Sequence, residues 1–179
     1  MLSLVSLLFA ILAGVLYVLK GSPFLLLAAI MVLVSGFFDA LDGKVARISS
    51  KASKRGDFVD HVIDRYSDAI ILGAIAVSSR CEVSFGLFAV IGVLLASYMG
   101  TQAQALGLGR EYRGILGRAD RIAVLVIVSI IQYFLELGDS SLAKDIFDYS
   151  LMSWMMVYFG LAGNITALQR ARLIWKSLP

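Results

Sequence analysis

Residues 39–64 read DALDGKVARISSKASKRGDFVDHVID, and the interpretation of the whole chain follows from this stretch. Four of its five aspartates, Asp39, Asp42, Asp60 and Asp64, form two closely spaced pairs. The first pair is spaced i, i+3 and the second i, i+4, so the members of each pair share one face of a helix. The intervening loop, residues 49–55, turns the second helix back antiparallel to the first. The two acidic faces can then oppose each other.

The segments on either side of this stretch are apolar. Hydrophobic residues make up 59% of the 179 residues and the mean hydropathy is +0.85, whereas a soluble domain is about 45–50% apolar. Several segments approach the ~20 apolar residues that span a bilayer. We therefore predict an all-α integral membrane protein, with residues 1–179 forming a single domain built as a six-transmembrane-helix bundle. The predicted spans are residues 2–19, 24–48, 57–79, 83–108, 119–138 and 150–174, with a short amphipathic helix at 142–149.

Basic residues are concentrated on one side of this predicted topology. They follow the second span at Lys44, Arg47, Lys51, Lys54 and Arg55, the fourth at Arg110, Arg113, Arg118 and Arg121, and end the sixth at Arg170, Arg172 and Lys176. Because Lys and Arg accumulate in cytoplasmic loops, this distribution predicts a multi-pass cell-membrane protein with both termini and the acidic stretch facing the cytoplasm. The single cysteine, Cys81, excludes an intrachain disulfide. The sequence shows no basic soluble face of the kind that binds nucleic acid.

The four carboxylates indicate a metal centre. Ionisable groups at membrane depth are unfavourable and are usually kept for function. An all-oxygen shell suits Mg²⁺ or Mn²⁺, and two opposed pairs can enclose one or two ions. In isolation, two aspartates near a helix end are more often solvated cap residues, but four of them beside small residues and an arginine favour a metal site. At its edge, Asp64 can accept the proton of an attacking hydroxyl.

The residues between the acidic pairs suit a phosphate ester. Gly43, Ala46 and Gly56 are small and permit a ligand to approach the helix backbone. Arg47 can donate two hydrogen bonds to a phosphate, and Ser53 adds a hydroxyl. Two other classes of membrane protein also use acidic clusters. An intramembrane prenyltransferase would bind a diphosphate through Mg²⁺, and a cation transporter would need acids near the bilayer midplane and an inverted repeat, which this sequence does not show.

The spacing D-x-x-D-G-x-x-A-R-x(8)-G-x-x-x-D-x-x-x-D resembles the signature of the CDP-alcohol phosphotransferase family. Its fixed positions are matched by Asp39, Asp42, Gly43, Ala46, Arg47, Gly56, Asp60 and Asp64. The resemblance implies that a phosphoalcohol, usually that of a CDP-linked lipid, is transferred to a second alcohol with release of CMP in phospholipid biosynthesis. It also implies two metal ions, bridged by Asp39 and Asp60, with Asp42 bound to one and Asp64 to the other. The residues that would surround CDP are Gly43, Ala46, Arg47, Ser53 and Gly56.

Within that family the chain is most similar to the prokaryotic branch that makes phosphatidyl- or archaetidylinositol phosphate. The similar segments are residues 36–39, 64–68, 97–98, 105–107 and 117–121. The last contains Arg118 and Arg121, which suit an anionic acceptor phosphate but can equally be positive-inside anchors. That branch tends to have basic residues after Tyr98, whereas this chain has Gly100, Thr101, Gln102 and Gln104. An unphosphorylated polyol acceptor, or a synthase that joins CDP-inositol to inositol phosphate, therefore stays open.

Further expectations concern the helix surfaces and the start of the chain. Small residues at Ala96, Gly100 and 103–107 can pack helices closely or line the interface of a homodimer, which we expect. Asp68 is expected to pair with Arg65, and His61 to be non-catalytic. The amphipathic N-terminal helix that many members of the family carry is expected to be missing.

Overall fold

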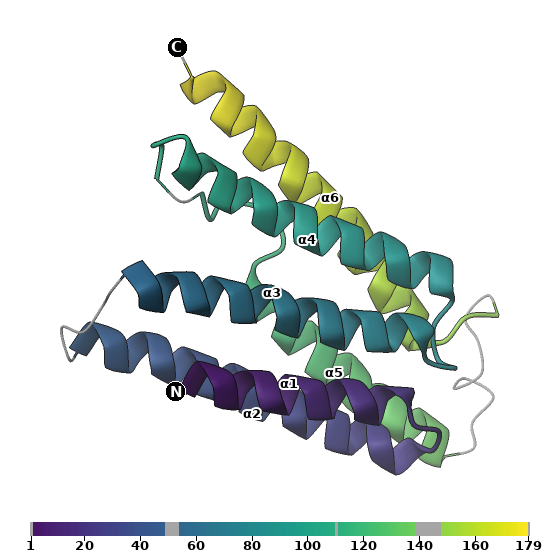
Figure 1. Ribbon diagram of the computed structural model, residues 1–179. Helices are drawn as coiled ribbons and strands as arrows, with labels where there is room; N and C mark the ends of the chain where they lie inside the picture. Colours follow the sequence, from purple (N-terminus) through teal and green to yellow (C-terminus); the bar gives the residue numbers. More distant parts are fainter. Residues whose placement is uncertain (1, 49–53, 110, 139–147, 179) are drawn as a thin grey trace.

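The described part of the chain forms six helices. The structure, a computed structural model, describes residues 2–48, 54–109, 111–138 and 148–178, without the side chains of residues 43 and 45–48 (Figure 1). The helices are α1 (Leu2–Val18), α2 (Ser22–Ile48), α3 (Lys54–Val77), α4 (Val83–Ala105), α5 (Arg118–Leu137) and α6 (Leu151–Ser177). All six predicted helices are confirmed, with small displacements at their ends. The short helix predicted at 142–149 falls almost entirely outside the described residues.

Three of these helices are long and apolar enough to cross a membrane. They are the Ser22–Asp42 part of α2, α4 and α6, and α1 is apolar but shorter. In contrast, α3 carries charged residues along its first half, which lowers its mean hydropathy. The all-helical membrane fold is therefore supported, while six spans remain a prediction.

The helices run roughly along a common axis, so that connections alternate between two ends of the bundle (Figure 1). One end holds the first turn of α1, the end of α2, the start of α3, the α4–α5 loop and the C-terminal part of α6. Helix α1 packs against both α2 and α3, α5 packs against α2, and α4 makes an extensive contact with α6. At the opposite end, Arg80 Nε donates to Glu136 Oε1 over 2.7 Å and joins the α3–α4 loop to α5.

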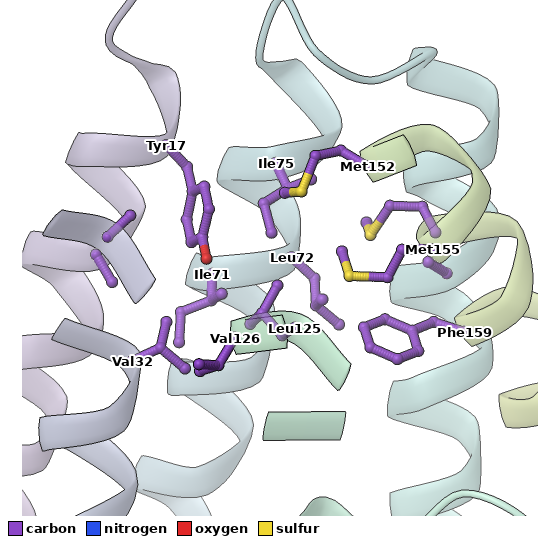
Figure 2. Close-up of a cluster of buried hydrophobic side chains, with 14 of the residues drawn as sticks. Tyr17, Val32, Ile71, Leu72, Ile75, Leu125, Val126, Met152, Met155 and Phe159 are labelled. Carbon is purple, nitrogen blue, oxygen red and sulfur yellow. The ribbon is translucent and has the colours of Figure 1, made fainter. Parts of the chain in front are cut away.

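The core combines apolar side chains from every helix with a few paired hydroxyls. Figure 2 shows Tyr17, Val32, Ile75 and Phe159 among this cluster, which extends from α1 to α6. The Tyr17 hydroxyl lies 2.7 Å from Ser129 Oγ, which in turn donates to the Leu125 carbonyl. Since a polar group in an apolar bundle is tolerated only when it finds a partner, these bonds fix α1 against α5.

Close backbone contact between α4 and α6 depends on glycine. A Cβ atom on Gly163 would lie 2.6 Å from the Gly92 carbonyl carbon, and one on Gly160 would lie 2.2 Å from the Phe88 ring. Small residues at such positions let helix backbones approach each other in membranes. The small residues predicted to line a homodimer interface also lie inside the chain in part, because Ala96 and Ala103 are buried. They therefore support helix packing rather than the expected homodimer, which stays a prediction.

We expect Gly163→Ala to lower the free energy of unfolding by about 1–3 kcal/mol, because the added methyl group would meet backbone atoms that cannot move aside alone. Thermal unfolding in detergent measures the effect. Gly73→Ala is the matched control, since a Cβ there would meet nothing within 4 Å and alanine favours a helix. Equal unfolding temperatures for the two variants would show that the α4–α6 contact is looser than described.

Candidate functional site

Three of the four predicted carboxylates converge between α2 and α3. Asp39 comes from α2, and Asp60 and Asp64 come from successive turns of α3. One carboxylate oxygen from each residue lies within 4.8 Å of the other two. Helix α1 contacts both helices and so fixes the distance between them. Asp64 is buried, while Asp39 and Asp60 are partly accessible, so the group opens on one side.

Asp42 lies beside this group with a different partner. Its Oδ2 atom accepts a hydrogen bond from the Ser3 backbone N–H over 2.9 Å and another from the Ser3 hydroxyl. Ser3 is in the first turn of α1, where backbone N–H groups lack helical partners and attract negative charge. The contact joins α1 to α2 at the level of the acidic group. No local pattern in the sequence predicts this contact, and the role of Asp42 as a metal ligand stays a prediction.

Arg118 enters the acidic group from the first residue of α5. Its Nη1 atom lies 3.1 Å from Asp39 Oδ2 and also contacts Asp64 Oδ1. Arg118 therefore offsets only part of the negative charge of the three carboxylates. The spacing of residues 117–121 suggested an anion-binding arginine, but it did not predict that this arginine would reach the aspartates.

A second ion-pair network flanks the first. Arg121 is buried, and its Nη2 atom donates to Asp68 Oδ2 over 2.7 Å. Arg65 Nη2 lies 3.7 Å from the same Asp68 oxygen and 3.6 Å from Asp64 Oδ2. The expected pairing of Asp68 with Arg65 is thus present, and Arg121 completes it. A role for Arg121 at an acceptor phosphate stays a prediction, because the structure gives it a carboxylate partner.

The acidic group has the chemistry of a site for a hard divalent cation. Its ligand atoms are carboxylate oxygens, which Mg²⁺, Mn²⁺ and Ca²⁺ prefer. Asp39 Oδ1 is buried, and among the described residues no hydrogen-bond donor reaches it. A buried anionic oxygen without a donor is unfavourable unless a cation compensates it. The residues present therefore fit a metal ion held by Asp39, Asp60 and Asp64.

The residues predicted to hold CDP continue from this group toward the end of the bundle. Gly43, Ala46 and Arg47 occupy the last turns of α2, where side chains are not described. Gly56 is exposed in the first turn of α3. Ser53 lies outside the described residues. The helical register places these positions next to the carboxylates along the chain, and their contacts with a nucleotide stay predictions.

Sequence reasoning missed a cavity of about 610 Å³ on the other side of α3, facing α4. Its polar lining includes His61, Arg65, Ser97, Thr101 and Gln104. His61 lies 3.9 Å from Asp60 Oδ2 through Nδ1, so the cavity borders the acidic group. The i, i+4 spacing of His61 and Arg65 was the available signal. Two of the uncharged residues that distinguish this chain after Tyr98, Thr101 and Gln104, thus line the cavity.

Comparison with known proteins agrees with the signature. A sequence model described as CDP-alcohol phosphatidyltransferase matches residues 1–165. Archaetidylinositol phosphate synthase of Methanothermobacter thermautotrophicus is 30% identical over 162 residues, which cover 88% of this chain and 74% of that protein. The synthase of the same name from Pyrococcus horikoshii is 40% identical over 105 residues, covering 59% of this chain and only 56% of its own length. A bifunctional IPC transferase and DIPP synthase of Archaeoglobus fulgidus is 31% identical over 108 residues, covering 57% of this chain and 22% of that protein.

Solved structures show the same fold. Phosphatidylinositol phosphate synthase of Mycobacterium tuberculosis in complex with manganese and citrate superimposes with a TM-score of 0.74 at 22% identity, covering 97% of this chain and 82% of that one. The same enzyme with CDP-DAG bound gives a TM-score of 0.71 at 21% identity, covering 97% and 86%.

Proposed function

The chain belongs to the CDP-alcohol phosphatidyltransferase family, and from this premise we propose that it transfers a phosphoalcohol from a CDP-linked donor to a polar alcohol and releases CMP. The observation that carries the proposal is the convergence of Asp39, Asp60 and Asp64 within 4.8 Å. A donor diphosphate carries negative charge, and an acidic group can hold it only through cations. The proposed transferred group is phosphatidyl or archaetidyl, because the relatives are named for these lipids.

One or two divalent ions, Mg²⁺ or Mn²⁺, would neutralise the diphosphate and stabilise the leaving phosphate when bound. Asp39, Asp60 and Asp64 would hold them, and Asp42 would be the fourth ligand. Manganese in the structure of the Mycobacterium tuberculosis enzyme supports this choice. Arg47, with Gly43, Ala46, Ser53 and Gly56, would contact the CDP moiety at the adjoining ends of α2 and α3.

Asp64 is proposed to accept the proton of the acceptor hydroxyl. It is buried between Arg118 and Arg65, which orient its two oxygens. The acceptor oxygen forms a bond to the phosphorus that carries the donor alcohol, and the bond from that phosphorus to CMP breaks. The hydroxyl proton passes to Asp64. Arg118 lies within reach of both the carboxylates and an incoming anion, so an acceptor phosphate is its proposed second partner.

Inositol phosphate is the proposed acceptor. The names of the archaeal relatives support it. A second candidate, the joining of CDP-inositol to inositol phosphate, is favoured by two observations. A relative of this chain is a bifunctional IPC transferase and DIPP synthase, and the cavity beside α3 is lined by neutral hydroxyl and amide groups from α4 that suit a polyol.

We further propose six spans with both termini and the site facing the cytoplasm. The C-terminal end of α2, the α4–α5 loop and the basic end of α6 lie at one end of the bundle (Figure 1), and Asp39 and Asp60 belong to the parts of α2 and α3 that are nearest to this end. Such an excess of Lys and Arg marks the cytoplasmic side. The cell membrane is the corresponding location, and a homodimer remains part of the proposal.

A product assay tests the proposed reaction. Purified protein with Mg²⁺ would receive either a CDP-lipid or CDP-inositol, together with inositol phosphate, inositol, serine, glycerol phosphate or glycerol. We expect CMP release with a CDP-lipid and inositol phosphate, loss of CMP release with a chelator, and recovery on adding Mg²⁺ or Mn²⁺. Pyrophosphate release from a prenyl diphosphate, or cation flux in liposomes without CMP, would replace the proposal with a prenyltransferase or a transporter.

A further inference from the structure

A second cavity lies away from the acidic group, between the α4–α5 loop and the end of α6. It has a volume of about 540 Å³ and is lined by Arg113, Gly114, Gln169, Arg172, Leu173 and Lys176. None of these residues belongs to the site described above. The loop and the C-terminal end of α6 lie at the same end of the bundle (Figure 1).

The cavity is built on a loop that α6 holds in place. The guanidinium of Arg170 is buried and donates to the carbonyls of Arg113 over 2.8 Å and Tyr112 over 3.0 Å. Thr166 Oγ1 accepts from the backbone N–H groups of the two residues that follow Gly114. Gly114 has φ 147°, and a Cβ there would lie 2.3 Å from the Thr166 methyl group. The loop therefore has a fixed conformation before any ligand binds.

The charges around the cavity are not balanced within the described part of the chain. Arg172 and Lys176 are spaced i, i+4 on α6, where like charges repel each other, and neither forms an ion pair with a described residue. Arg113 faces them from the loop. Its partner is Glu111, which accepts from Arg113 Nε over 2.9 Å and from Nη2 over 2.7 Å. These hydrogen bonds hold the pKa of Glu111 at about 2, so Glu111 stays ionised and balances one of the three cations.

The neighbouring side chains place the cavity at the level of a membrane surface. Trp175 adjoins Lys176 and is 80% exposed, and Leu168 adjoins Gln169 and is 70% exposed. Exposed tryptophan at the end of an apolar helix is typical of the interface between lipid and water. Clustered cations at that level attract anionic headgroups. The cavity therefore presents two uncompensated cations where phosphate groups are concentrated.

We propose that the cavity formed by Arg113, Arg172 and Lys176 binds a phosphate group, supplied by an anionic phospholipid headgroup or by a free phosphorylated polyol. Arginine can donate two hydrogen bonds to such a group, and lysine adds a point charge. The fixed loop supplies Arg113 without a further ordering step. None of the three residues belongs to the acidic group between α2 and α3.

Fluorescence of Trp175 tests the proposal directly. Trp154→Phe leaves Trp175 as the sole tryptophan, so the fluorescence of the variant reports on lipids beside the cavity. The protein would be placed in phosphatidylcholine nanodiscs that contain either brominated phosphatidylglycerol or brominated phosphatidylcholine. We expect stronger quenching by the anionic lipid. Arg172→Gln with Lys176→Gln should lower the apparent affinity for that lipid about 30-fold, from the loss of two cations near the surface.

Lys20→Gln is the matched control, because Lys20 is an exposed cation in the short connection between α1 and α2. This connection lies at the other end of the bundle (Figure 1), so the substitution should leave the quenching unchanged. Inorganic phosphate and inositol phosphate, titrated in plain phosphatidylcholine nanodiscs, distinguish the sources. A change in Trp175 fluorescence on adding either phosphate, lost when Arg172 and Lys176 are replaced, would assign the site to a free phosphate. If neither phosphate changes the fluorescence but the anionic lipid quenches more strongly, the site binds the lipid headgroup. Equal quenching by both lipids together with no response to either phosphate would overturn the proposal.

Discussion

Asp64→Asn should slow CMP release by about 10²–10⁴-fold, the usual contribution of a positioned general base. The amide has the shape of the carboxylate but cannot accept the acceptor proton. One amide oxygen remains for a cation, and Asp39 and Asp60 are untouched, so donor binding should persist in part. Single-turnover release of CMP from a CDP-lipid measures the loss of rate. Spectroscopic titration with Mn²⁺ and a binding assay with the donor measure how much cation and donor binding persists.

The control for this variant is Asp57→Asn. Asp57 lies on the same helix, and its side chain is 57% exposed and pairs with His61 rather than with the acidic group. Its loss should leave turnover close to that of the wild type. Full activity in Asp64→Asn would show that another group takes the proton. A parallel loss of Mn²⁺ binding, donor binding and turnover would instead show that Asp64 acts only as a ligand.

Much of the fold could be predicted because long apolar segments leave few alternatives. Each predicted span has an observed helix, and the ends follow from Gly, Pro and charged residues. Helix length and hydropathy nevertheless identify only three candidate spans among the described residues, fewer than the six predicted. Helix α3 shows the physical reason. A helix that supplies Asp60, Asp64, Arg65 and Asp68 to a buried site must carry them within its length. The same residues that make the site thus lower the apolar signal of the helix.

The convergence of Asp39, Asp60 and Asp64 could also be predicted, since spacing along a helix fixes which side chains share a face. The partners from other helices could not. Ser3 reaches Asp42 from α1, and Arg118 reaches Asp39 and Asp64 from α5. Such contacts join residues far apart in sequence and depend on how helices are rotated and offset. Periodicity within one helix carries no information on either quantity.

Arg170 illustrates the same limit with a residue whose sequence context was misleading. In the sequence it is one of three cations near the end of the last helix, which suggests a positive-inside anchor. In the structure it is 9% exposed, and its Nη1 atom donates to the Ala96 carbonyl over 2.6 Å in addition to the two loop carbonyls. A single side chain therefore connects α4, the α4–α5 loop and α6. The position of α5, and with it Arg118, depends on that loop.

We accordingly expect Arg170→Gln to destabilise the protein by about 3 kcal/mol or more, because three carbonyls lose their donor and an unpaired buried acceptor is unfavourable by about 1–3 kcal/mol. The unfolding temperature in detergent should fall on the order of 10 °C. Gln is shorter than Arg and carries one amide group, so it cannot reach all three carbonyls. The unfolding temperature of Arg170→Lys should lie between those of the wild type and Arg170→Gln, since an ammonium keeps the charge but not the planar arrangement of donors.

Arg172→Gln is the control for the loss of a cation from the same helix, because Arg172 is exposed and makes no ion pair with a described residue. Its unfolding temperature should match that of the wild type. If Arg170→Gln behaves like Arg172→Gln, the carbonyls find other donors and the loop is held chiefly by Thr166. If Arg170→Gln is destabilised and loses CMP release at temperatures where it is still folded, then the loop also positions Arg118. That outcome would link a buried arginine at the end of α6 to the acidic group between α2 and α3.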